Sequence, residues 1–104
     1  GLLYVQAEEG DTYVTIAADM GFDAGELARY NDNSRNAVLS AGEIVYLQPK
    51  MRKAHPNCPM HNVLEGETFY SISQRYGIDM KRLARRNQMR WDDELEEGLV
   101  LMLR

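Results

Sequence analysis

The sequence predicts an α+β protein built from two tandem copies of a small βααβ unit. The first observation is an internal repeat, because shifting the chain against itself by 56 positions, without a gap, superimposes many identical residues. The matches begin at Glu9-Gly10-Asp11-Thr12 on Glu65-Gly66-Glu67-Thr68 and continue at Ile16, Gly21, Asp23, Leu27, Ala28, Arg29, Asn31, Leu39, Gly42 and Leu47 with their partners 56 residues later. The second observation is that each copy places strand, helix, helix and strand signals in that order. A repeat of roughly this length is one supersecondary unit that has been copied.

The repeat divides the chain into three parts. They are a first unit at residues 1–48, a linker at residues 49–60 with Pro49, Pro56 and Pro59, and a second unit at residues 61–104. Units of this size lie near the lower limit for a stable hydrophobic core, so neither is expected to house a large buried active site. The one cysteine, Cys58, lies in the linker and has no partner for an internal disulfide, so packing must stabilise the units.

The first strand and first helix have clear local signals in the first unit. A short apolar run, Leu3-Tyr4-Val5, has strand character and ends before Gly10. Asp11 and Thr12 follow it, and both are residue types that cap helix N-termini. The expected apolar stripe of this helix consists of Tyr13, Ile16, Ala17 and Met20. A glycine, Gly21, is expected to stop the helix.

The second helix of this unit is predicted by a cap and by its inward residues. Asp23 and Glu26, three residues apart, form a carboxylate version of the capping box. The helix would bury Leu27 and part of Tyr30. The expected order after it is a left-handed exit at Asn31, a polar loop at residues 32–41 and a closing strand at Ile44-Val45-Tyr46-Leu47.

The second unit repeats the same order. Its expected elements are a strand at His61-Asn62-Val63, a helix capped by Thr68 with the stripe Phe69, Ile72, Ser73 and Tyr76, a stop at Gly77, a helix from Asp79 that buries Met80 and Leu83, and a last strand at residues 99–103. Two strands flank a helix pair in each unit, so the simplest arrangement is a two-stranded antiparallel sheet with both helices packed on one face.

The chain has a net charge of −4, and its charged residues are unevenly distributed between the two units. Residues 1–48 carry eight acidic side chains against two basic ones, whereas residues 61–104 carry eight against seven. Nucleic-acid affinity depends on phosphate neutralisation by Lys and Arg, so no nucleic-acid partner is expected and a neutral or mixed-charge ligand fits better. A basic cluster in the second unit is expected to be a solvated helix face: Lys81, Arg82, Arg85, Arg86 and Arg90.

No stretch approaches the roughly 20 apolar residues of a membrane span, so no membrane-spanning segment is expected. The chain begins at Gly1 rather than at a methionine, which suggests a piece of a longer protein whose targeting signal lies elsewhere. No cofactor or metal is expected. His55, Cys58 and His61 are spaced by three residues but lack a fourth ligand. Catalysis within the chain is not expected either, because nothing fixes a pair of carboxylates in a cleft.

The repeated residues resemble the LysM repeat. In the first unit the resemblance lies in Gly10-Asp11-Thr12, Ile16-Ala17, Gly21, Leu27, Asn31, Leu39 and Gly42. In the second unit it lies in residues 61–68, Ile72, Tyr76-Gly77-Ile78, Leu83, Asn87 and Gly98. The resemblance covers both units and leaves out only the linker. It implies a βααβ fold, non-catalytic binding of the N-acetylglucosamine-containing backbone of peptidoglycan or chitin, and a location outside the cytoplasm, in the periplasm, the cell wall or secreted.

The tandem arrangement, with Tyr-Leu-Gln-Pro-Lys at the boundary, is also similar to the C-terminal region of bacterial cell-wall glucosaminidases of the Bacteroidetes type. That similarity implies an attached catalytic domain, of N-acetylglucosaminidase type, which the two units would target to its polymer. The alternative is a structural or protein-interaction module that packs on the catalytic domain and binds little sugar. If only one unit binds sugar, the second is favoured, because Met89 supplies an apolar family position that Asn33 occupies in the first.

A groove for a neutral sugar needs backbone polar groups and apolar contacts. In this topology, the turn between the first strand and first helix meets the loop between the second helix and second strand. Carrying the family's groove onto these loops gives the expected ligand-binding residues: Gly66, Glu67, Thr68, Phe69, Arg90, Trp91 and Asp92 in the second unit, and Gly10, Asp11, Thr12, Tyr13, Arg35, Asn36 and Ala37 in the first.

These residues also have structural interpretations. Gly10 and Gly66 suit any tight turn between a strand and a helix. The residues beside them would cap a helix with or without a sugar: Asp11, Thr12, Glu67 and Thr68. Tyr13 and Phe69 lie on the apolar stripes and are candidates for the core as well as for the groove floor. Trp91 lies in a polar loop, where it would stack on a pyranose ring or cover the core of the second unit.

Overall fold

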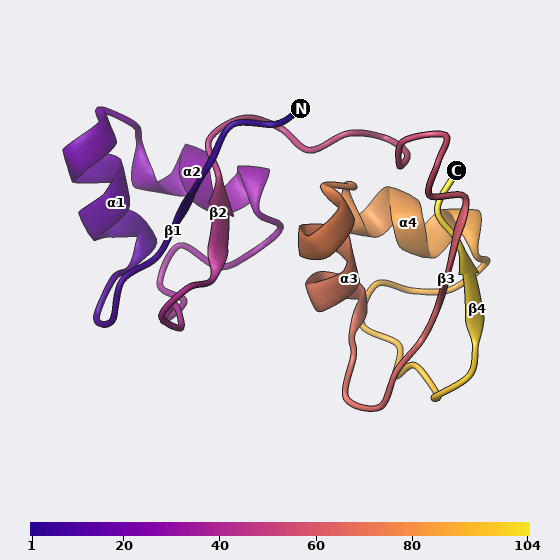
Figure 1. The fold of residues 1–104 in the computed structure, drawn as a ribbon. Coiled ribbons are helices and arrows are strands. Elements are labelled where there is room, and N and C mark those ends of the chain that lie inside the picture. The colour runs from indigo at the N-terminus through magenta and orange to yellow at the C-terminus, as the bar shows by residue number, and fades with distance from the viewer. The chain divides into compact units, whose positions relative to one another are not determined.

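The computed structural model describes residues 1–104 and contains two compact units, Gly1–Lys50 and Met51–Arg104. Each unit has two strands and two helices in the order βααβ (Figure 1). The predicted α+β class and the composition of each unit are therefore confirmed. None of the helices has the length and apolar character needed to cross a membrane.

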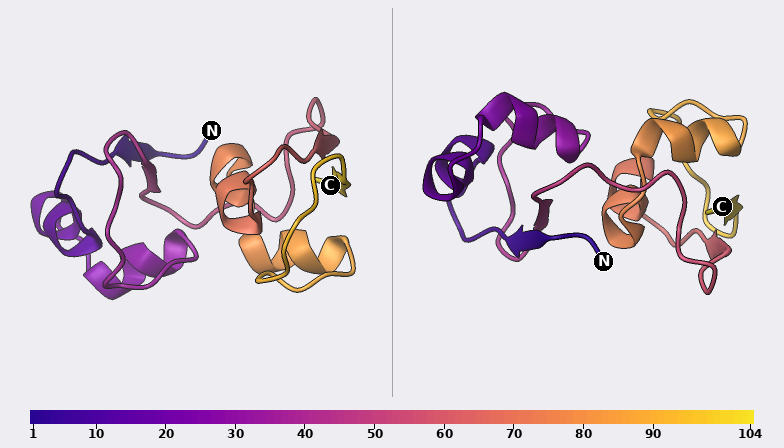
Figure 2. Two further views of the ribbon diagram at one scale, coloured as in Figure 1. Left: turned by 90° about the horizontal axis from the view of Figure 1, so that it is seen from below. Right: turned by 90° about the horizontal axis from the view of Figure 1, so that it is seen from above.

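The first unit pairs its first and last elements. It consists of β1 (Tyr4–Gln6), α1 (Tyr13–Met20), α2 (Ala24–Tyr30) and β2 (Ile44–Tyr46). β1 and β2 are antiparallel, with Val5 opposite Val45. The two helices lie together on one side of this strand pair (Figure 2). The sheet therefore has one face covered by helices, as the sequence predicts.

The second unit has the same topology. It consists of β3 (Met60–Asn62), α3 (Phe69–Tyr76), α4 (Met80–Arg86) and β4 (Val100–Met102). β3 and β4 are antiparallel, with His61 opposite Leu101. All four strands are three residues long, so β2 and β4 are shorter than the predicted runs, whereas β1 and β3 have the predicted length and are shifted by one residue. Sheets this small depend on packing against the helices for their stability.

The first helix of each unit begins and ends as predicted. The hydroxyls of Thr12 and Thr68 accept hydrogen bonds from the amide three residues later, and the hydroxyl of that later residue accepts from the threonine amide. This reciprocal capping box satisfies two amides that the helix leaves unpaired. Gly21 and Gly77 end the helices with φ values of 78° and 69°, a left-handed conformation that favours glycine.

The second helix of the first unit is capped at its N-terminus by Asp23. Only one of the two hydrogen bonds of the predicted capping box is formed. The Asp23 carboxylate accepts from the Glu26 amide at 3.0 Å. The Glu26 carboxylate accepts instead from the hydroxyl of Tyr30. Residues four apart lie on the same helix face, so Tyr30 is within reach of Glu26.

The left-handed exit of this helix lies one residue later than predicted. Asn31 has a φ of −103°, whereas Asp32 has a φ of 51°. The second unit repeats this pattern, with Gln88 at a φ of 54° after Asn87. The prediction of a left-handed conformation at Asn31 was therefore wrong. The Asn31 side chain forms hydrogen bonds to the neighbouring strand instead.

The Asn31 carboxamide joins the end of α2 to β2. Its Nδ2 donates to the carbonyls of Leu27, at 2.8 Å, and Tyr46, at 3.0 Å. Its Oδ1 accepts from the Tyr46 amide at 2.7 Å. Asn87 makes the equivalent three bonds in the second unit, to Leu83 and Met102. The repeated asparagine is thus a buried or half-buried link between helix and strand.

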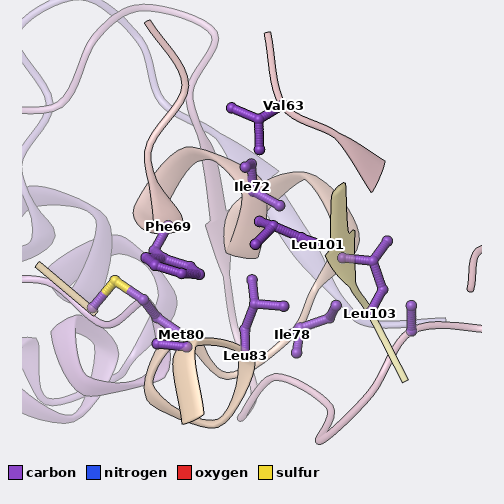
Figure 3. Close-up of a cluster of buried hydrophobic side chains, with 10 residues drawn as sticks. Val63, Phe69, Ile72, Ile78, Met80, Leu83, Leu101 and Leu103 are labelled. Carbon is purple, nitrogen blue, oxygen red and sulfur yellow. The ribbon is translucent and has the colours of Figure 1, made fainter. Parts of the chain in front are cut away.

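Each unit has its own hydrophobic core between helices and sheet. The first core contains Ala7, Tyr13, Ile16, Ala17, Ala24, Leu27, Ala28, Leu39 and Val45. The second contains Ala54, Val63, Phe69, Ile72, Ile78, Met80, Leu83, Ala84, Leu101 and Leu103. Figure 3 shows side chains from α3, α4 and β4 converging on this second core. Met20 is about half exposed, so the buried stripe of α1 ends at Ala17.

Residues 51–59, which fall within the expected linker, pack on the second unit. The Met51 amide donates to the Gly77 carbonyl at 2.7 Å, and the Ala54 amide donates to the Leu103 carbonyl at 2.8 Å. Ala54 is only 5% exposed and belongs to the second core. The second unit thus includes an extra segment before its first strand.

Candidate functional site

The two loops expected to form a site meet in the first unit. Thr12, at the end of the β1–α1 turn, forms an antiparallel bridge with Val38 of the α2–β2 loop. The Leu39 amide also donates to the Asp11 carbonyl at 3.4 Å. Val38 is 83% exposed, so this junction presents an apolar side chain to solvent. Val38 lies in the loop expected to form the groove, directly after the predicted contact Ala37.

In the second unit the equivalent positions are Thr68 and Glu94, and no bridge joins them. The tip of the α4–β4 loop is closed by the same backbone hydrogen bond as the tip of the first loop, where Ala37 donates to Ser34. The Arg90 amide donates to the Asp93 carboxylate at 2.8 Å, and the Asp93 amide donates to the Arg90 carbonyl at 3.0 Å. The two copies of the expected site therefore differ in backbone pairing.

Asp11 holds the β1–α1 turn together. One carboxylate oxygen accepts from the Glu8 amide and the other accepts from the Thr15 hydroxyl, each at 2.8 Å. These two hydrogen bonds, the amide first, lower the pKa of Asp11. The carboxylate is therefore committed to the turn and to the start of α1.

Glu67 occupies the matching position and reaches a different partner. Its Oε1 accepts from the Leu64 amide at 2.6 Å and lies 2.8 Å from Nε2 of His61. Nδ1 of the buried His61 lies 2.8 Å from the Tyr76 hydroxyl. Burial opposes ionisation of Glu67, but the Leu64 amide and His61 outweigh it, and the pKa of Glu67 is lowered.

Gly10 and Gly66 have φ values of 86° and 82°, and open space surrounds the position of an added Cβ at each. Their glycine character thus follows from the backbone conformation of the turn. Thr12 and Thr68 cap helices, as described above. The structural interpretation accounts for these four residues, and sugar contact by them stays a prediction.

Tyr13 and Phe69 are both 0% exposed and belong to the two cores. Of the two predicted roles, core or groove floor, the structure places both rings in the cores. Each ring belongs to the first residue of a helix and points inward from it. Nδ2 of Asn33 donates to the Tyr13 hydroxyl at 3.1 Å. These rings would affect a ligand only through the loops that they support.

The tip of the α2–β2 loop presents Arg35 and Asn36 to solvent. Ala37 is partly buried and packs against the first core. Its amide donates to the Ser34 carbonyl at 3.0 Å, which closes the turn at this tip. Two of the three predicted side chains of this loop are therefore accessible.

Trp91 is 48% exposed and lies beside α4. It borders a hollow of about 210 Å³ together with Lys81, Ala84, Arg85, Met89 and Arg90. Arg90 forms an exposed ion pair with the other predicted loop residue, Asp92, at 3.5 Å. The indole thus covers part of α4 and leaves a ring surface open to solvent.

No group of three or more His, Cys, Asp and Glu side chains is arranged to hold a metal ion. His61 is engaged by Tyr76 and Glu67, and Cys58 packs against the second core.

Family comparison identifies the repeat. The model of the LysM domain matches residues 6–47 and 61–103, which together make up most of the chain. The chain belongs to the LysM family. LysM domains are non-catalytic modules that generally bind N-acetylglucosamine-containing glycans such as peptidoglycan and chitin, and they are typically associated with the cell wall outside the cytoplasm.

Two solved structures are similar to this pair of LysM domains. One is the spore cortex-lytic enzyme SleL of Bacillus cereus, at 22% identity and a TM-score of 0.42, covering 99% of this chain and 22% of that one. The other is SleL of Bacillus megaterium QM B1551, at 19% identity and a TM-score of 0.41, covering 95% and 21%. The chain therefore spans about a fifth of the length of these enzymes. No curated protein matches the chain.

Proposed function

We propose that this chain is a glycan-binding module that targets a larger cell-wall enzyme to N-acetylglucosamine-containing polymers, peptidoglycan above all. The observation that carries the proposal is the presence of two LysM domains that both keep the capped strand-to-helix turn. In the first domain this turn is bridged to a loop with an exposed apolar residue, Val38. Backbone polar groups beside a small apolar surface suit a sugar that carries hydroxyl and acetamido groups.

Two domains on one polymer strengthen each other. A single shallow site of this kind is expected to contribute roughly −4 to −8 kcal/mol, which corresponds to millimolar to micromolar dissociation constants. A polymer that engages both sites gains further by avidity. Tandem LysM domains thus suit retention on an insoluble wall.

The proposed parent is an N-acetylglucosaminidase-type enzyme of the Bacteroidetes type, exported to the periplasm, the cell wall or the medium. The similarity of the tandem units to the C-terminal region of such enzymes supports this part of the proposal. The catalytic domain would be the second partner of the chain. Catalysis belongs to that domain and not to the two LysM domains.

One observation favours a second candidate function, a module that packs on an attached catalytic domain. Asp11 and Glu67, two of the predicted polar contacts, are engaged by internal hydrogen bonds. Fewer side chains are then left to select a ligand. Backbone polar groups in the loops can still bind a sugar, and for this reason we favour the glycan proposal over this alternative.

Co-sedimentation with purified peptidoglycan sacculi tests the proposal. We expect the chain to sediment with sacculi, and soluble N-acetylglucosamine oligomers to release it. Val38→Asp should reduce retention, because it places a charge on the apolar part of the first groove. Leu3→Asp is the control, since Leu3 is also exposed but lies outside both loops. A chain that stays in the supernatant at tens of micromolar, the range expected for such sites, would contradict glycan targeting and support the packing alternative.

A further inference from the structure

The exposed side of α4 carries a concentration of positive charge. Four arginines line a hollow of about 430 Å³: Arg52, Arg82, Arg85 and Arg86. Three of them come from α4 and the fourth, Arg52, comes from the segment before β3. The sequence predicts a solvated helix face here, but it does not reveal that Arg52 lies beside these arginines and that the four border a shallow, open depression.

In one of these arginines, Arg86, one terminal guanidinium nitrogen has a hydrogen-bond partner and the other has none. Nη2 of Arg86 donates to the Arg52 carbonyl at 2.8 Å. Nη1 of Arg86 is buried and has no hydrogen-bond partner. A buried donor that lacks a partner costs free energy, and Nη1 has too little accessible surface to contact an ion in the hollow.

No ion pair involves the arginines of the hollow, and the nearest acidic cap is Asp79, whose carboxylate accepts from the Arg82 amide at 2.9 Å. The ion pairs of the structure are Lys50 with Asp32, His61 with Glu67 and Arg90 with Asp92. Like charges gathered in a concavity repel one another and attract an anion. A planar guanidinium binds a carboxylate or a phosphate through paired N–H donors.

A second hollow adjoins the first. It is the hollow of about 210 Å³ beside Trp91, and Arg85 lines both. Ala84 and Met89 give it an apolar lining, and about half of the Trp91 surface is exposed. An exposed aromatic ring provides an apolar face for a flat molecule such as a sugar ring. The two hollows together offer a cationic part and an aromatic part joined at Arg85.

We propose that this side of α4 binds an anionic saccharide. The pyranose ring lies against Trp91, and its carboxylate or phosphate group enters the arginine hollow, where Arg85, which lines both hollows, donates to it. None of the residues that line the two hollows belongs to the capped turn at Thr68, although Arg90 and Trp91 come from the loop expected to face that turn. The proposed site would therefore bind acidic sugars in addition to neutral N-acetylglucosamine. It does not depend on the neutral-sugar binding proposed above.

Binding is tested by NMR titration of the intact chain with three separate probes: N-acetylmuramic acid, which carries a carboxylate, N-acetylglucosamine 6-phosphate, and neutral tri-N-acetylglucosamine. We expect the acidic sugars to shift the amide signals of residues 81–91 and the indole signal of Trp91, and added salt to weaken this effect. The neutral trimer should leave these signals in place. The probe that binds more tightly identifies the source as a carboxylated or a phosphorylated sugar.

Arg85→Ala should weaken binding of the acidic probe about tenfold or more, since a hydrogen bond to a charged group contributes about 1.5–3 kcal/mol. The matched control is Arg29→Ala, because Arg29 occupies the same repeat position in α2 and is likewise exposed. Arg85 is itself exposed, so its replacement should leave the amide spectrum of the second core unchanged.

Three results would overturn the proposal. The first is the absence of shifts at residues 81–91 with millimolar acidic sugar. The second is equal weakening by Arg85→Ala and Arg29→Ala. The third is tighter, salt-sensitive binding of a single-stranded oligonucleotide at the same residues, because phosphates and stacked bases would suit the same pair of hollows.

Discussion

The two LysM domains share a backbone but hold it with different side chains. Asp11 and Glu67 both close the turn by accepting from the amide three residues earlier. Their second partners differ, because Asp11 also accepts from Thr15 in the helix, whereas Glu67 contacts His61 in the strand. The repeat therefore preserves where the chain turns, while the second partner of each carboxylate has diverged.

The helix–loop contact differs in the same way. The first domain pairs Tyr13 with Asn33 through a hydrogen bond at 3.1 Å. The second has Phe69 and Met89 at the equivalent positions, both packed in or against its core. A polar pair in one domain is replaced by an apolar pair in the other. The polar residue at position 33, which departs from the family pattern, thus has a structural partner.

The largest expected difference comes from the segment before β3. Ala54→Asp would bury an unpaired carboxylate in the second core and should destabilise that domain by about 3 kcal/mol or more. The first domain should be unaffected. Amide hydrogen exchange, read residue by residue, measures both domains in one chain. Lys53→Asp, at an exposed neighbour, is the control. Unchanged protection of the second domain in Ala54→Asp would show that the segment is not part of its core.

The asparagine link should matter more in the first domain. Asn31→Ala removes three hydrogen bonds from a residue with no exposed surface and should cost about 2–4 kcal/mol. Asn87→Ala removes the same bonds at a half-buried site and should cost about 1–2 kcal/mol. Exchange of the Tyr46 and Met102 amides reports the two effects, with exposed Asn36→Ala as control. Equal effects would mean that burial does not set the strength of the link.

The Tyr13 and Asn33 pair is tested by a double-mutant cycle. Tyr13→Phe and Asn33→Met together convert the first domain to the pair found in the second. Each single change should destabilise the first domain, and the double mutant should be less destabilised than their sum by about 1 kcal/mol. Urea unfolding followed at amides of the first core provides the measurement. Strict additivity would argue against direct coupling of the two side chains.

The smallest expected effect concerns acid. The pKa of Glu67 is lowered in the folded state, so its contribution is present above the unfolded pKa of 4.5 and is lost as pH falls through the folded value. Glu67→Gln should remove this dependence, with a change below about 1 kcal/mol for a partly exposed pair. The free energy of unfolding of the second domain, measured from about pH 6 to about pH 3 so as to span the ordinary titration range of a Glu side chain, reports this effect. An identical acid dependence in both proteins would contradict the role of the Glu67 contacts.

Most of the fold could be predicted because its signals are local. Thr12 and Gly21 mark the two ends of α1 through capping interactions that depend on a few neighbouring residues. The copy 56 residues later shows the same pattern. The left-handed exit after α2 was misplaced because the task of Asn31 depends on Tyr46, fifteen residues away. Contacts over such distances leave little trace in a local pattern.

The candidate site was harder to predict for the same reason. The meeting of the two loops in the first domain follows from the topology, but the bridge from Thr12 to Val38 depends on the loop backbone. Trp91 borders a hollow on α4, a place that its position in a polar loop does not specify. Arg52 lies in the expected linker, and its place beside Arg86 follows from the packing of that segment.

The asparagine link also limits how these small sheets can associate. Tyr46 directs its N–H and C=O away from β1, and the Asn31 side chain supplies the acceptor and the donor that a third strand would otherwise offer. Met102 is covered by Asn87 in the same way. The outer edges of β2 and β4 are therefore closed at their last residues. Exposed strand edges recruit other chains into growing sheets, so a side-chain amide in each domain occupies backbone groups of β2 and β4 with which a further strand could otherwise pair.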